Sequence, residues 1–578
     1  MTLIAGIFNR KGHPLADSVC RELAQSVSRH PDDVIKTIRK PNAFFAKLDI
    51  GAFSSNAVLE SDDAISLLTG EPLLEGASRD RHDDLGIMHE GLLERRFDRL
   101  RDASGAFTIA HYPSRPASLT FIGDKCALRP LYFWVSDEIV VFASALRIIE
   151  ACSLVPKKMD LRGVTEIVAL NTTLGDRTPY VDVHRLTPGL VVEINRNHVR
   201  YKSYWRWDRI DSTGESEAVR LEAVHEAFAH AISLRMGNEQ STSAFLSGGL
   251  DSRLIVAALR ERGTRVHTVN FALTGTQDQF LGDEFAQQAA SIHRSIPREA
   301  GDQVPDYSSL MAGVLKNWNR DCERPSVVWS GEGGSTTLGF VRFTESIVGQ
   351  MRSGQVDSVI EWFVRDEATQ VPTRMFRPHV LDDAMETVRQ GVREELSKFD
   401  AADPAWNLYL FLTLSDQARK LTRHFENIDL HRLEFQAPFF DPNLLQAVLT
   451  SRLDWFLRHK FYHKLLPYFG AAAARVPWQS YPGHEPCPLP IPANLTYQWN
   501  QEHWESERSV KRQSIVARAL LLLRETDFPN HILDRRKLRV AAWIHSTGWR
   551  DYQYAIEAAE TYSRYSSICN GEFNGSLS

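Results

Sequence analysis

The sequence predicts a two-domain protein in which an α+β sandwich is followed by an α/β unit. At 578 residues the chain is several times the length of a typical domain. Short β-type runs separated by turn residues continue to about residue 205, which is typical of packed sheets with few helices. From residue 216 to residue 271 the pattern changes to helix, strand, helix and strand. That order predicts a parallel sheet covered by helices.

The composition is that of a soluble globular protein. Hydrophobic residues make up 43% of the chain and charged residues 24%, with ordinary numbers of glycine and proline. The formal net charge of -6 argues against a general nucleic-acid binder. We therefore expect no nucleic-acid partner.

Cysteine usage and the apolar runs predict a cytoplasmic protein. The six cysteines are scattered, with no CxxC pair and no zinc-ligand spacing, as expected for a reduced protein. The opening MTLIAGIFNRKG lacks the long apolar core of a signal peptide. Aliphatic runs such as Ala519 to Leu523 are far too short to span a bilayer. We expect neither secretion nor a membrane partner.

The first domain is expected to occupy residues 1–208. Its β-type runs are IAGIF, FFAKLDIGAF, AISLL, AFTIAHY, SLTFIG, LYFWV, IVVFAS and GLVVEI. After YKSYWRWD the character changes to amphipathic helix, and the segment IDSTGES interrupts both patterns. We place the boundary near residues 208–214, so that the second domain comprises residues 215–578.

The strongest local signal is AFLSGGLDSRLIVAALR, from Ala244 to Arg260. A β-run ends in Ser-Gly-Gly, where glycines allow backbone N–H groups to turn toward an anion. Ser252 then opens a helix whose N-terminus carries partial positive charge. The pattern predicts a loop that grips a phosphate chain. It is not a Walker A motif, because no GKS or GKT closes it.

Asp251 lies next to this loop and suits Mg²⁺, which prefers carboxylate and phosphate oxygens. The structural alternative is a tight Gly-Gly turn between a strand and a helix, with the aspartate as a cap. The buried strand before the turn and the LDS sequence after it favour the phosphate loop.

SGGLDS resembles the pyrophosphatase loop of the asparagine synthetase superfamily, whose members split ATP into AMP and pyrophosphate while adenylating a carboxylate. Further stretches follow in the family's order between about Leu3 and Pro486. In the first half they are AGIFN, GAFTIAHY, IGDKCALRPLYFW, RLTPG and YW. In the second half they are VHTVNF, GDEFAQQAA, WSGEGG and LTRHFENIDLHRLEFQAPFFD.

The resemblance implies an Ntn-type αββα sandwich followed by an adenine-nucleotide α-hydrolase-like domain with a parallel sheet. It implies ATP and Mg²⁺ as cofactors, with Asp251 as a metal ligand. Glu332 in WSGEGG matches a catalytic acid or base, and Glu434 in LEFQAP matches a second carboxylate that can orient it. The positions matched to ATP binding are Phe245, Leu246, Ser247, Gly248, Gly249, Asp251, Ser252, Val269, Ser330 and Gly331.

The first half departs from the family's glutaminase pattern. An active glutaminase of this type needs an amino-terminal cysteine, and we place that position at Ala5. Thr69 stands where the glutamine-binding motif has asparagine. Thr2 could serve as a nucleophile after removal of Met1, but it lies three residues from the position that we align. We therefore expect an inactive scaffold, as in beta-lactam synthetase and the lasso-peptide cyclases, which this chain resembles.

The second half of the chain departs from the family's sequence pattern at two points. The second metal-binding aspartate after SGEG is replaced by Ser335, so Mg²⁺ is expected at Asp251, Asp283 or Glu284, or at a hydroxyl. The family's closing-loop lysine is not evident either. VPWQSYPGHEPCPLP, residues 476–490, contains the alternatives Gln479 and His484 and could form a rigid lid. Lys460 and Lys464 lie on the helix before it.

Three functional hypotheses remain. The first is an AMP-forming ligase that joins a carboxylate to an amine of a small-molecule or peptide substrate, for example in lasso-type macrolactam formation. Such a ligase could also work with a biosynthetic partner protein. The second is an amidotransferase that uses free or externally supplied ammonia. The third is a non-catalytic binding protein that keeps the fold. Turnover of ATP to AMP would distinguish the first two from the third.

Overall fold

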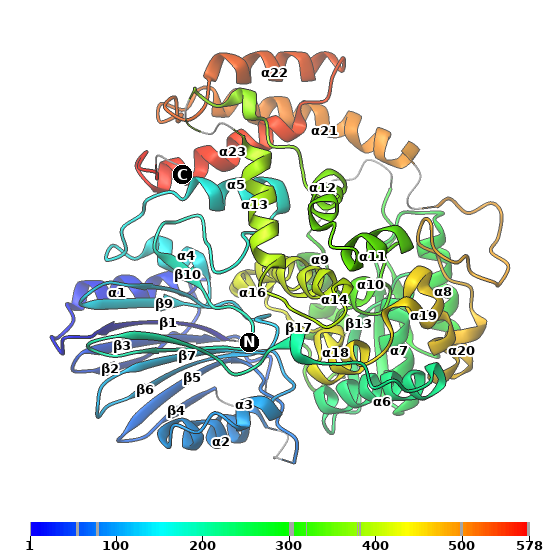
Figure 1. The fold of residues 1–578 in the computed structure, drawn as a ribbon, viewed down its shortest axis with the longest axis horizontal. Coiled ribbons are helices and arrows are strands. Elements are labelled where there is room, and N and C mark those ends of the chain that lie inside the picture. The colour runs from blue at the N-terminus through cyan, green and yellow to red at the C-terminus, as the bar shows by residue number, and fades with distance from the viewer. Residues whose placement is uncertain are drawn as a thin grey trace.

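The computed structural model describes residues 2–53, 57–76, 80–299, 306–318, 321–378, 380, 383–497 and 501–574, without the side chains of 501–510. Two sheet-based units lie side by side, and a group of helices covers one end of both (Figure 1). Within the described residues, no helix is long and apolar enough to cross a membrane.

The first unit consists of two antiparallel six-stranded sheets packed face to face. The first sheet contains, in spatial order, β10 (Val183–Arg185), β8 (Tyr132–Val135), β9 (Ile139–Ala143), β1 (Thr2–Asn9), β3 (Ala43–Asp49) and β2 (Lys36–Lys40). The second contains β12 (Val199–Ser203), β11 (Leu190–Ile194), β7 (Leu119–Gly123), β6 (Phe107–Pro113), β5 (Ala64–Gly70) and β4 (Val58–Glu60). A cluster of buried side chains from both sheets fills the space between them.

Helices cover the outer faces of this sandwich. The first sheet is covered by α1 (Asp17–Ser26) and α4 (Leu146–Ala151), and the second by α2 (Arg81–Leu93) and α3 (Arg99–Asp102). The sequence prediction of an αββα sandwich is confirmed. α5 (Leu161–Leu170) extends from this unit toward the helices of the second.

The second unit is built on a five-stranded sheet in which every pair of neighbouring strands is parallel. Its spatial order is β15 (Ile292–Ser295), β14 (Arg265–Asn270), β13 (Ser241–Phe245), β16 (Val327–Trp329) and β17 (Glu434–Gln436). The helices that connect or cover these strands are α6 (Glu217–Met236), α7 (Asp251–Glu261), α8 (Gln277–Gln288) and α9 (Tyr307–Trp318). This is the parallel sheet that the sequence predicts, and β13 lies at its centre.

Further helices extend the second unit. Those before β17 are α10 (Gly334–Thr337), α11 (Glu345–Arg352), α12 (Val356–Asp366), α13 (Ala384–Leu396), α14 (Ala405–Leu410), α15 (Ala418–Lys420), α16 (Thr422–Glu426) and α17 (Ile428–His431). Those after it are α18 (Pro442–Leu449), α19 (Lys460–Leu465), α20 (Gly470–Arg475), α21 (Gln501–Leu522), α22 (Arg535–Thr547) and α23 (Gln553–Ile568). α22 forms the outermost layer of the final group (Figure 1).

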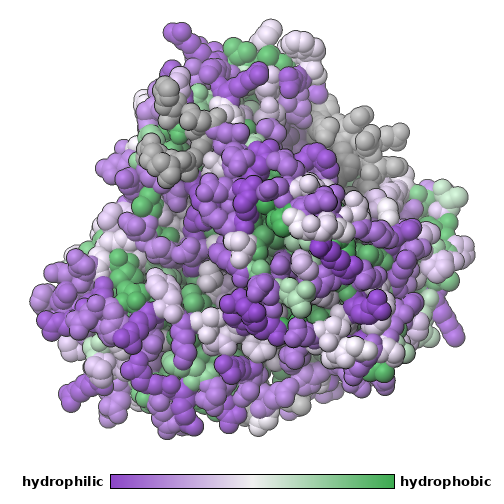
Figure 2. Space-filling model, in the orientation of Figure 1, coloured by the Kyte–Doolittle hydropathy of each residue, from purple (hydrophilic) through white to green (hydrophobic). Residues whose placement is uncertain are grey.

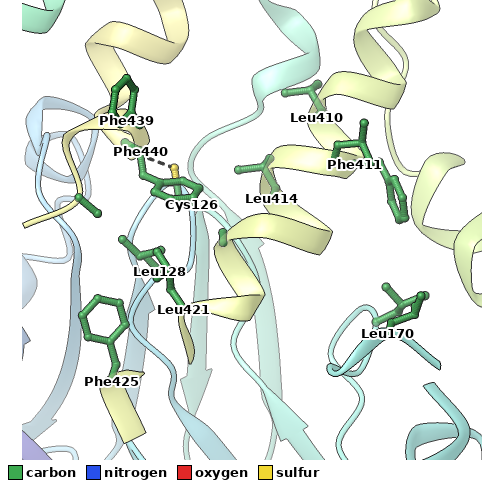
Figure 3. Close-up of a cluster of buried hydrophobic side chains, with 14 of the residues drawn as sticks. Cys126, Leu128, Leu170, Leu410, Phe411, Leu414, Leu421, Phe425, Phe439 and Phe440 are labelled. Carbon is green, nitrogen blue, oxygen red and sulfur yellow. Dashed lines mark hydrogen bonds between the residues drawn. The ribbon is translucent and has the colours of Figure 1, made fainter. Parts of the chain in front are cut away.

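The two units share one apolar core. Figure 3 shows Cys126 and Leu128, from the loop after β7, beside Phe440 and Leu421 of the second unit. The Cys126 thiol donates a hydrogen bond to the backbone oxygen of Phe440 at 3.6 Å. β12 ends at residue 203 and α6 begins at residue 217, so the boundary predicted at residues 208–214 falls between the last sandwich strand and the first helix of the second unit. The division into domains stays a prediction.

Candidate active site

The loop predicted to bind phosphate, residues 246–250 and called the phosphate loop below, follows β13 at the carboxyl end of the parallel sheet, where ligands bind in open α/β sheets. Phe245 is paired with Val269 of the neighbouring β14, and the N–H of Leu246 donates to the Val269 oxygen at 2.9 Å. The Phe245 ring contacts Phe271 and Phe435, with ring centroids 6.3 and 5.7 Å apart. These residues form an apolar wall next to the loop.

Hydrogen bonds within the loop fix its shape. The Ser247 N–H donates to the Ser252 hydroxyl oxygen at 2.9 Å, and the Gly249 N–H donates to the Ser247 hydroxyl oxygen at 3.3 Å. The two hydroxyl oxygens are 2.9 Å apart. Both serine hydroxyls therefore hold the turn, and their role in ligand binding stays a prediction.

Gly248 is hydrogen-bonded on both sides by two segments that the sequence did not link to the phosphate loop. Its N–H donates to the Asp278 carboxylate at 2.7 Å, and its oxygen accepts from the Gln479 N–H at 2.9 Å. A Cβ at this position would lie 2.8 Å from the Asp278 Cα, so only glycine fits. Burial raises the pKa of Asp278, and the Gly248 N–H opposes that rise.

The second loop, residues 330–335, leaves β16 beside the phosphate loop. A Cβ on Gly331 would lie 3.0 Å from the Ser252 nitrogen, and one on Gly334 would lie 2.5 Å from the Asp251 Cγ. The two glycines therefore allow the loops to pack directly against each other. The structure brings Gly331 next to Asp251 and Ser252, and the assignment of Ser330 and Gly331 to ATP binding stays a prediction.

Asp251 lies between these loops. Its Oδ1 accepts a hydrogen bond from the Tyr462 hydroxyl at 2.9 Å. Burial raises the pKa of Asp251 to about 7; the Tyr462 hydrogen bond opposes the rise, and the charge of Glu332 adds to it. A buried carboxylate that also faces the negative charge of a second carboxylate favours a bound cation. Sequence reasoning missed Tyr462, because it lies 211 positions from Asp251 and belongs to no motif.

Glu332 is exposed, and the surrounding protein nonetheless raises the pKa of its carboxyl by desolvation. The Glu332 carboxylate is therefore surrounded by protein atoms and still accessible to water. The charge of Lys420, at the end of α15, opposes the rise. Sequence reasoning did not single out Lys420, which also pairs with Asp416 at 2.9 Å.

Glu434 has a different environment from Glu332. Its carboxylate is fully buried and forms a two-pronged ion pair with the Arg129 guanidinium of the first unit. It starts β17 opposite Val327, whereas Ser330 follows the other end of β16. The charged neighbours found for Glu332 are Asp251 and Lys420. The idea that Glu434 orients Glu332 stays a prediction.

The segment predicted as a lid packs on the phosphate loop. The buried Arg253 guanidinium, on α7, donates to the backbone oxygens of Val476 and Pro477, and Gln479 donates to Gly248. His484 hydrogen-bonds to the Val341 oxygen at 3.1 Å, and its ring contacts the His459 ring at a tilt of 37°, with centroids 4.3 Å apart. The segment therefore closes over the loop.

The remaining predicted alternatives lie in other surroundings. Lys464 pairs with Glu217 at 2.6 Å, and Lys460 is exposed. Asp283 hydrogen-bonds to His293 at 2.9 Å. Glu284 lies within electrostatic range of the Arg253 guanidinium.

A metal site can be tested on the donors present. Among the described residues, no group of three or more His, Cys, Asp and Glu side chains is arranged to hold a metal ion. Mg²⁺ in nucleotide sites usually needs only one or two carboxylates, with phosphates and water as the other ligands. Asp251, facing the negative charge of Glu332, fits that requirement.

The first unit offers no accessible nucleophile at the predicted position. Ala5 is fully buried in the middle of β1, between Ala46 and Ala143 on the neighbouring strands. Thr2 is also fully buried, at the start of the same strand.

The Thr2 hydroxyl belongs to a buried charge cluster. It lies 3.4 Å from the Asp49 carboxylate and 3.3 Å from the Arg81 guanidinium. Arg81 and Lys47 pair with Asp49 at 2.6 and 3.2 Å. Burial lowers the pKa of Lys47 to about 8, and the Asp49 charge opposes that change. Sequence reasoning did not connect these charged groups with Thr2.

The stretch LLTGEPL, Leu67 to Leu73, which stands where the family has its glutamine-binding motif, contacts the second unit through Glu71. Thr69 is buried. The Glu71 carboxylate accepts from the Gln436 amide at 2.9 Å and pairs with Arg324 at 3.3 Å. Glu71, Gln436 and Arg129 line a small cavity between the two units, which has room for about one water molecule, near 20 Å³.

Comparisons with known proteins match both units. The model of the glutamine amidotransferase domain matches residues 87–205, and that of asparagine synthase matches residues 223–313. The protein named asparagine synthetase 2 of Methanocaldococcus jannaschii is 22% identical over 191 residues, which cover 32% of this chain and 36% of that protein. Asparagine synthetase 3 of Bacillus subtilis is 22% identical over 186 residues, or 32% of this chain and 30% of that protein. The matches thus span about a third of these relatives.

Two further proteins are similar to this chain. Amidase chyE of Penicillium rubens is 24% identical over 203 residues, 33% of this chain and 30% of that protein. The glutamine phosphoribosylpyrophosphate amidotransferase structure from B. subtilis, complexed with ADP and GMP, has a TM-score of 0.25 and 11% identity, and the match covers 56% of this chain and 93% of that one.

Proposed function

Because this chain belongs to the asparagine synthetase-like superfamily, we propose that it uses ATP to join a carboxylate to an amine. The carboxylate is adenylated with release of pyrophosphate, and the amine then displaces AMP to form the amide. The observation that carries the proposal is the direct packing of the two loops, through Gly331 and Gly334, around Asp251.

The phosphate loop supplies the anion site. Ser247, Gly249 and Ser252 form a fixed turn at the N-terminus of α7, where backbone N–H groups and the helix dipole favour phosphate. The wall that includes Phe245 and Val269 suits a flat, apolar adenine ring. The lid closes above the loop through Arg253 and Gln479 and limits the access of water to an activated carboxylate.

Asp251 would hold Mg²⁺ in this arrangement. The ion supplies charge neutralisation for the phosphates. The Tyr462 hydroxyl and the Ser335 backbone N–H both donate hydrogen bonds to the Asp251 carboxylate and fix its position.

Glu332 is the group that we assign to removal of the amine proton. It is exposed to the site, and desolvation raises its pKa, which improves a carboxylate as a base near neutral pH. Lys420 supplies positive charge in the same region. Glu434, tied to Arg129, is better suited to fixing the two units relative to each other than to proton transfer.

We further propose that the first unit does not hydrolyse glutamine. Ala5 offers no nucleophile, Thr2 is enclosed by charged groups, and Glu71 is committed to Arg324 and Gln436. The amine then comes from the substrate itself, as in macrolactam formation on a peptide. Free ammonia is the alternative, and a non-catalytic role is the third.

Pyrophosphate exchange tests the proposal. Purified protein with Mg²⁺, ATP and labelled pyrophosphate, supplied with a panel of amino acids, peptides and sugar acids, should return label to ATP with one class of carboxylate. Formation of an amide with ammonium alone would favour the amidotransferase alternative. Absence of ATP binding by calorimetry would favour the non-catalytic one.

A further inference from the structure

The outward face of α22 carries an unusual combination of side chains. Val540 and Trp543 are 54% and 66% exposed, and Trp549, just beyond the helix, is 83% exposed. Leu520 and Leu521 at the end of α21 are 46% and 63% exposed. Five of the fourteen large apolar side chains found exposed in the described residues thus fall within 30 positions. Exposed apolar groups gathered in this way indicate an interaction surface.

The same region is strongly basic. Residues 511–550 contain nine Lys and Arg against three Asp and Glu, in a chain whose net charge is -6. From residue 535 to residue 550 there is no acidic residue. In the described part of the chain, the exposed side chains of Arg536 and Arg539 make neither an ion pair nor a hydrogen bond. Their charge is therefore available to a partner.

Helical geometry places these two features on one surface. Leu538, Ala541, Ala542 and His545 are the buried residues of α22 and mark its inner side. Arg536, Val540 and Trp543, at i, i+4 and i+7, lie on the opposite side. α22 is the outermost helix of its group, so this surface is convex (Figure 1). In Figure 2 the α22 end carries hydrophilic residues with hydrophobic ones between them.

We propose that this surface, defined by Arg536, Lys537, Arg539, Val540, Trp543 and Trp549, docks the protein on an anionic lipid surface. Basic residues are attracted to anionic headgroups, and exposed tryptophan settles at the interface between headgroups and acyl chains. A convex helix fits a flat, fluid surface, whereas an acidic peptide would be better held in a groove. Docking of this kind needs no membrane-spanning helix and is independent of the proposed reaction.

Vesicle sedimentation of the full-length protein tests the inference. Vesicles of phosphatidylcholine with phosphatidylglycerol should pellet the protein, pure phosphatidylcholine should not, and tryptophan emission should shift to shorter wavelength on binding. Each basic residue near an anionic surface is worth roughly a fivefold change in partitioning, so Arg536→Glu/Lys537→Glu/Arg539→Glu should weaken binding by at least ~10²-fold. Trp543→Ser/Trp549→Ser should remove the emission shift.

The matched control is the triple variant Arg21→Glu/Lys36→Glu/Lys158→Glu, which replaces three exposed basic residues outside the proposed surface. It changes the net charge by the same amount as the test variant and should bind vesicles as well as the parent protein does. Circular dichroism confirms folding of each variant. Equal pelleting with both lipids, or equal loss in the control, would overturn the inference. If added poly-glutamate displaced the protein from the vesicles at the same salt concentration, the inference would also be overturned, because the surface would then favour an acidic polypeptide partner. Concentration-dependent self-association that the tryptophan substitutions abolish would assign the surface to a second copy.

Discussion

The Tyr462 hydroxyl donates a 2.9 Å hydrogen bond to the Asp251 carboxylate, across 211 positions of sequence. The bond links α19, which precedes the lid, to the start of α7 at the phosphate loop. It occupies one oxygen of the carboxylate that we assign to the metal. The positions of the lid helix and of the phosphate loop are therefore coupled.

Asp251→Asn should abolish turnover of ATP to AMP without unfolding the protein, because the amide keeps the shape and loses the charge for Mg²⁺. Asp357→Asn, an exposed aspartate on α12, is the matched control and should keep full turnover. AMP release measured by chromatography checks the result. Turnover retained in Asp251→Asn but lost in Asp283→Asn would move the metal to α8.

Glu332→Gln should separate the two half-reactions. Pyrophosphate exchange depends on phosphate positioning and should persist, whereas amide formation should fall by at least ~10²-fold at saturating amine, since a positioned base typically contributes ~10²- to 10⁴-fold. Parallel assays of both activities test this. An equal loss in both would show that Glu332 serves ATP or metal binding instead.

Incubation with glutamine should yield no glutamate above background, because no accessible nucleophile occupies the predicted position. The buried cluster around Thr2 makes Thr2→Ala the informative variant. Glutaminase activity in the parent that disappears in Thr2→Ala would show that this hydroxyl is a nucleophile and that our placement at Ala5 is wrong.

Arg129→Met should lower the free energy of unfolding by about 3–5 kcal/mol, because it leaves the buried Glu434 carboxylate without its partner. Arg129→Met/Glu434→Leu should recover most of the loss, since neither member then leaves a buried charge unpaired. Urea denaturation gives the values. A double variant as unstable as the single one would contradict the ion-pair explanation.

Stability should fall as the pH drops below about 6.5, and His459 should contribute to the fall. Burial lowers the pKa of His459 to about 3, with the charges of His484 and His463 acting in the same direction. Between about pH 6.5 and pH 3 the His459 side chain is protonated in the unfolded chain but neutral in the folded protein. Lowering the pH through this range therefore favours unfolding. From pH 6.5 to 5 this amounts to about 2 kcal/mol.

His459→Asn should flatten that dependence in thermal melts, and asparagine tolerates the left-handed backbone found there (φ 64°). His13→Asn, at an exposed histidine, is the control and should leave the profile unchanged. A profile that His459→Asn does not alter would assign the acid sensitivity to other buried histidines, such as His111, whose pKa burial also lowers to about 3.

The sequence by itself determined the sheet-rich first half, the parallel sheet of the second half and the glycine-containing turn between β13 and α7. These features follow from local rules: strand and helix periodicities, and glycines where backbone must approach closely, as at Gly248. Ser330 and Gly331 were assigned to ATP binding through the family resemblance and not through a local rule, and that assignment stays a prediction.

Only the tertiary structure decided what surrounds those residues. Arg129 and Glu434 are 305 positions apart, and no periodicity or motif predicts that the guanidinium of one unit neutralises the carboxylate of the other. Asp278 and Gln479 hold Gly248 through backbone groups, which carry no sequence signature. The pKa of Asp251 depends on burial and on charges brought together by folding. Such contacts depend on how whole helices and strands pack. For that reason the sequence indicated the turn between β13 and α7 but not the residues that contact it.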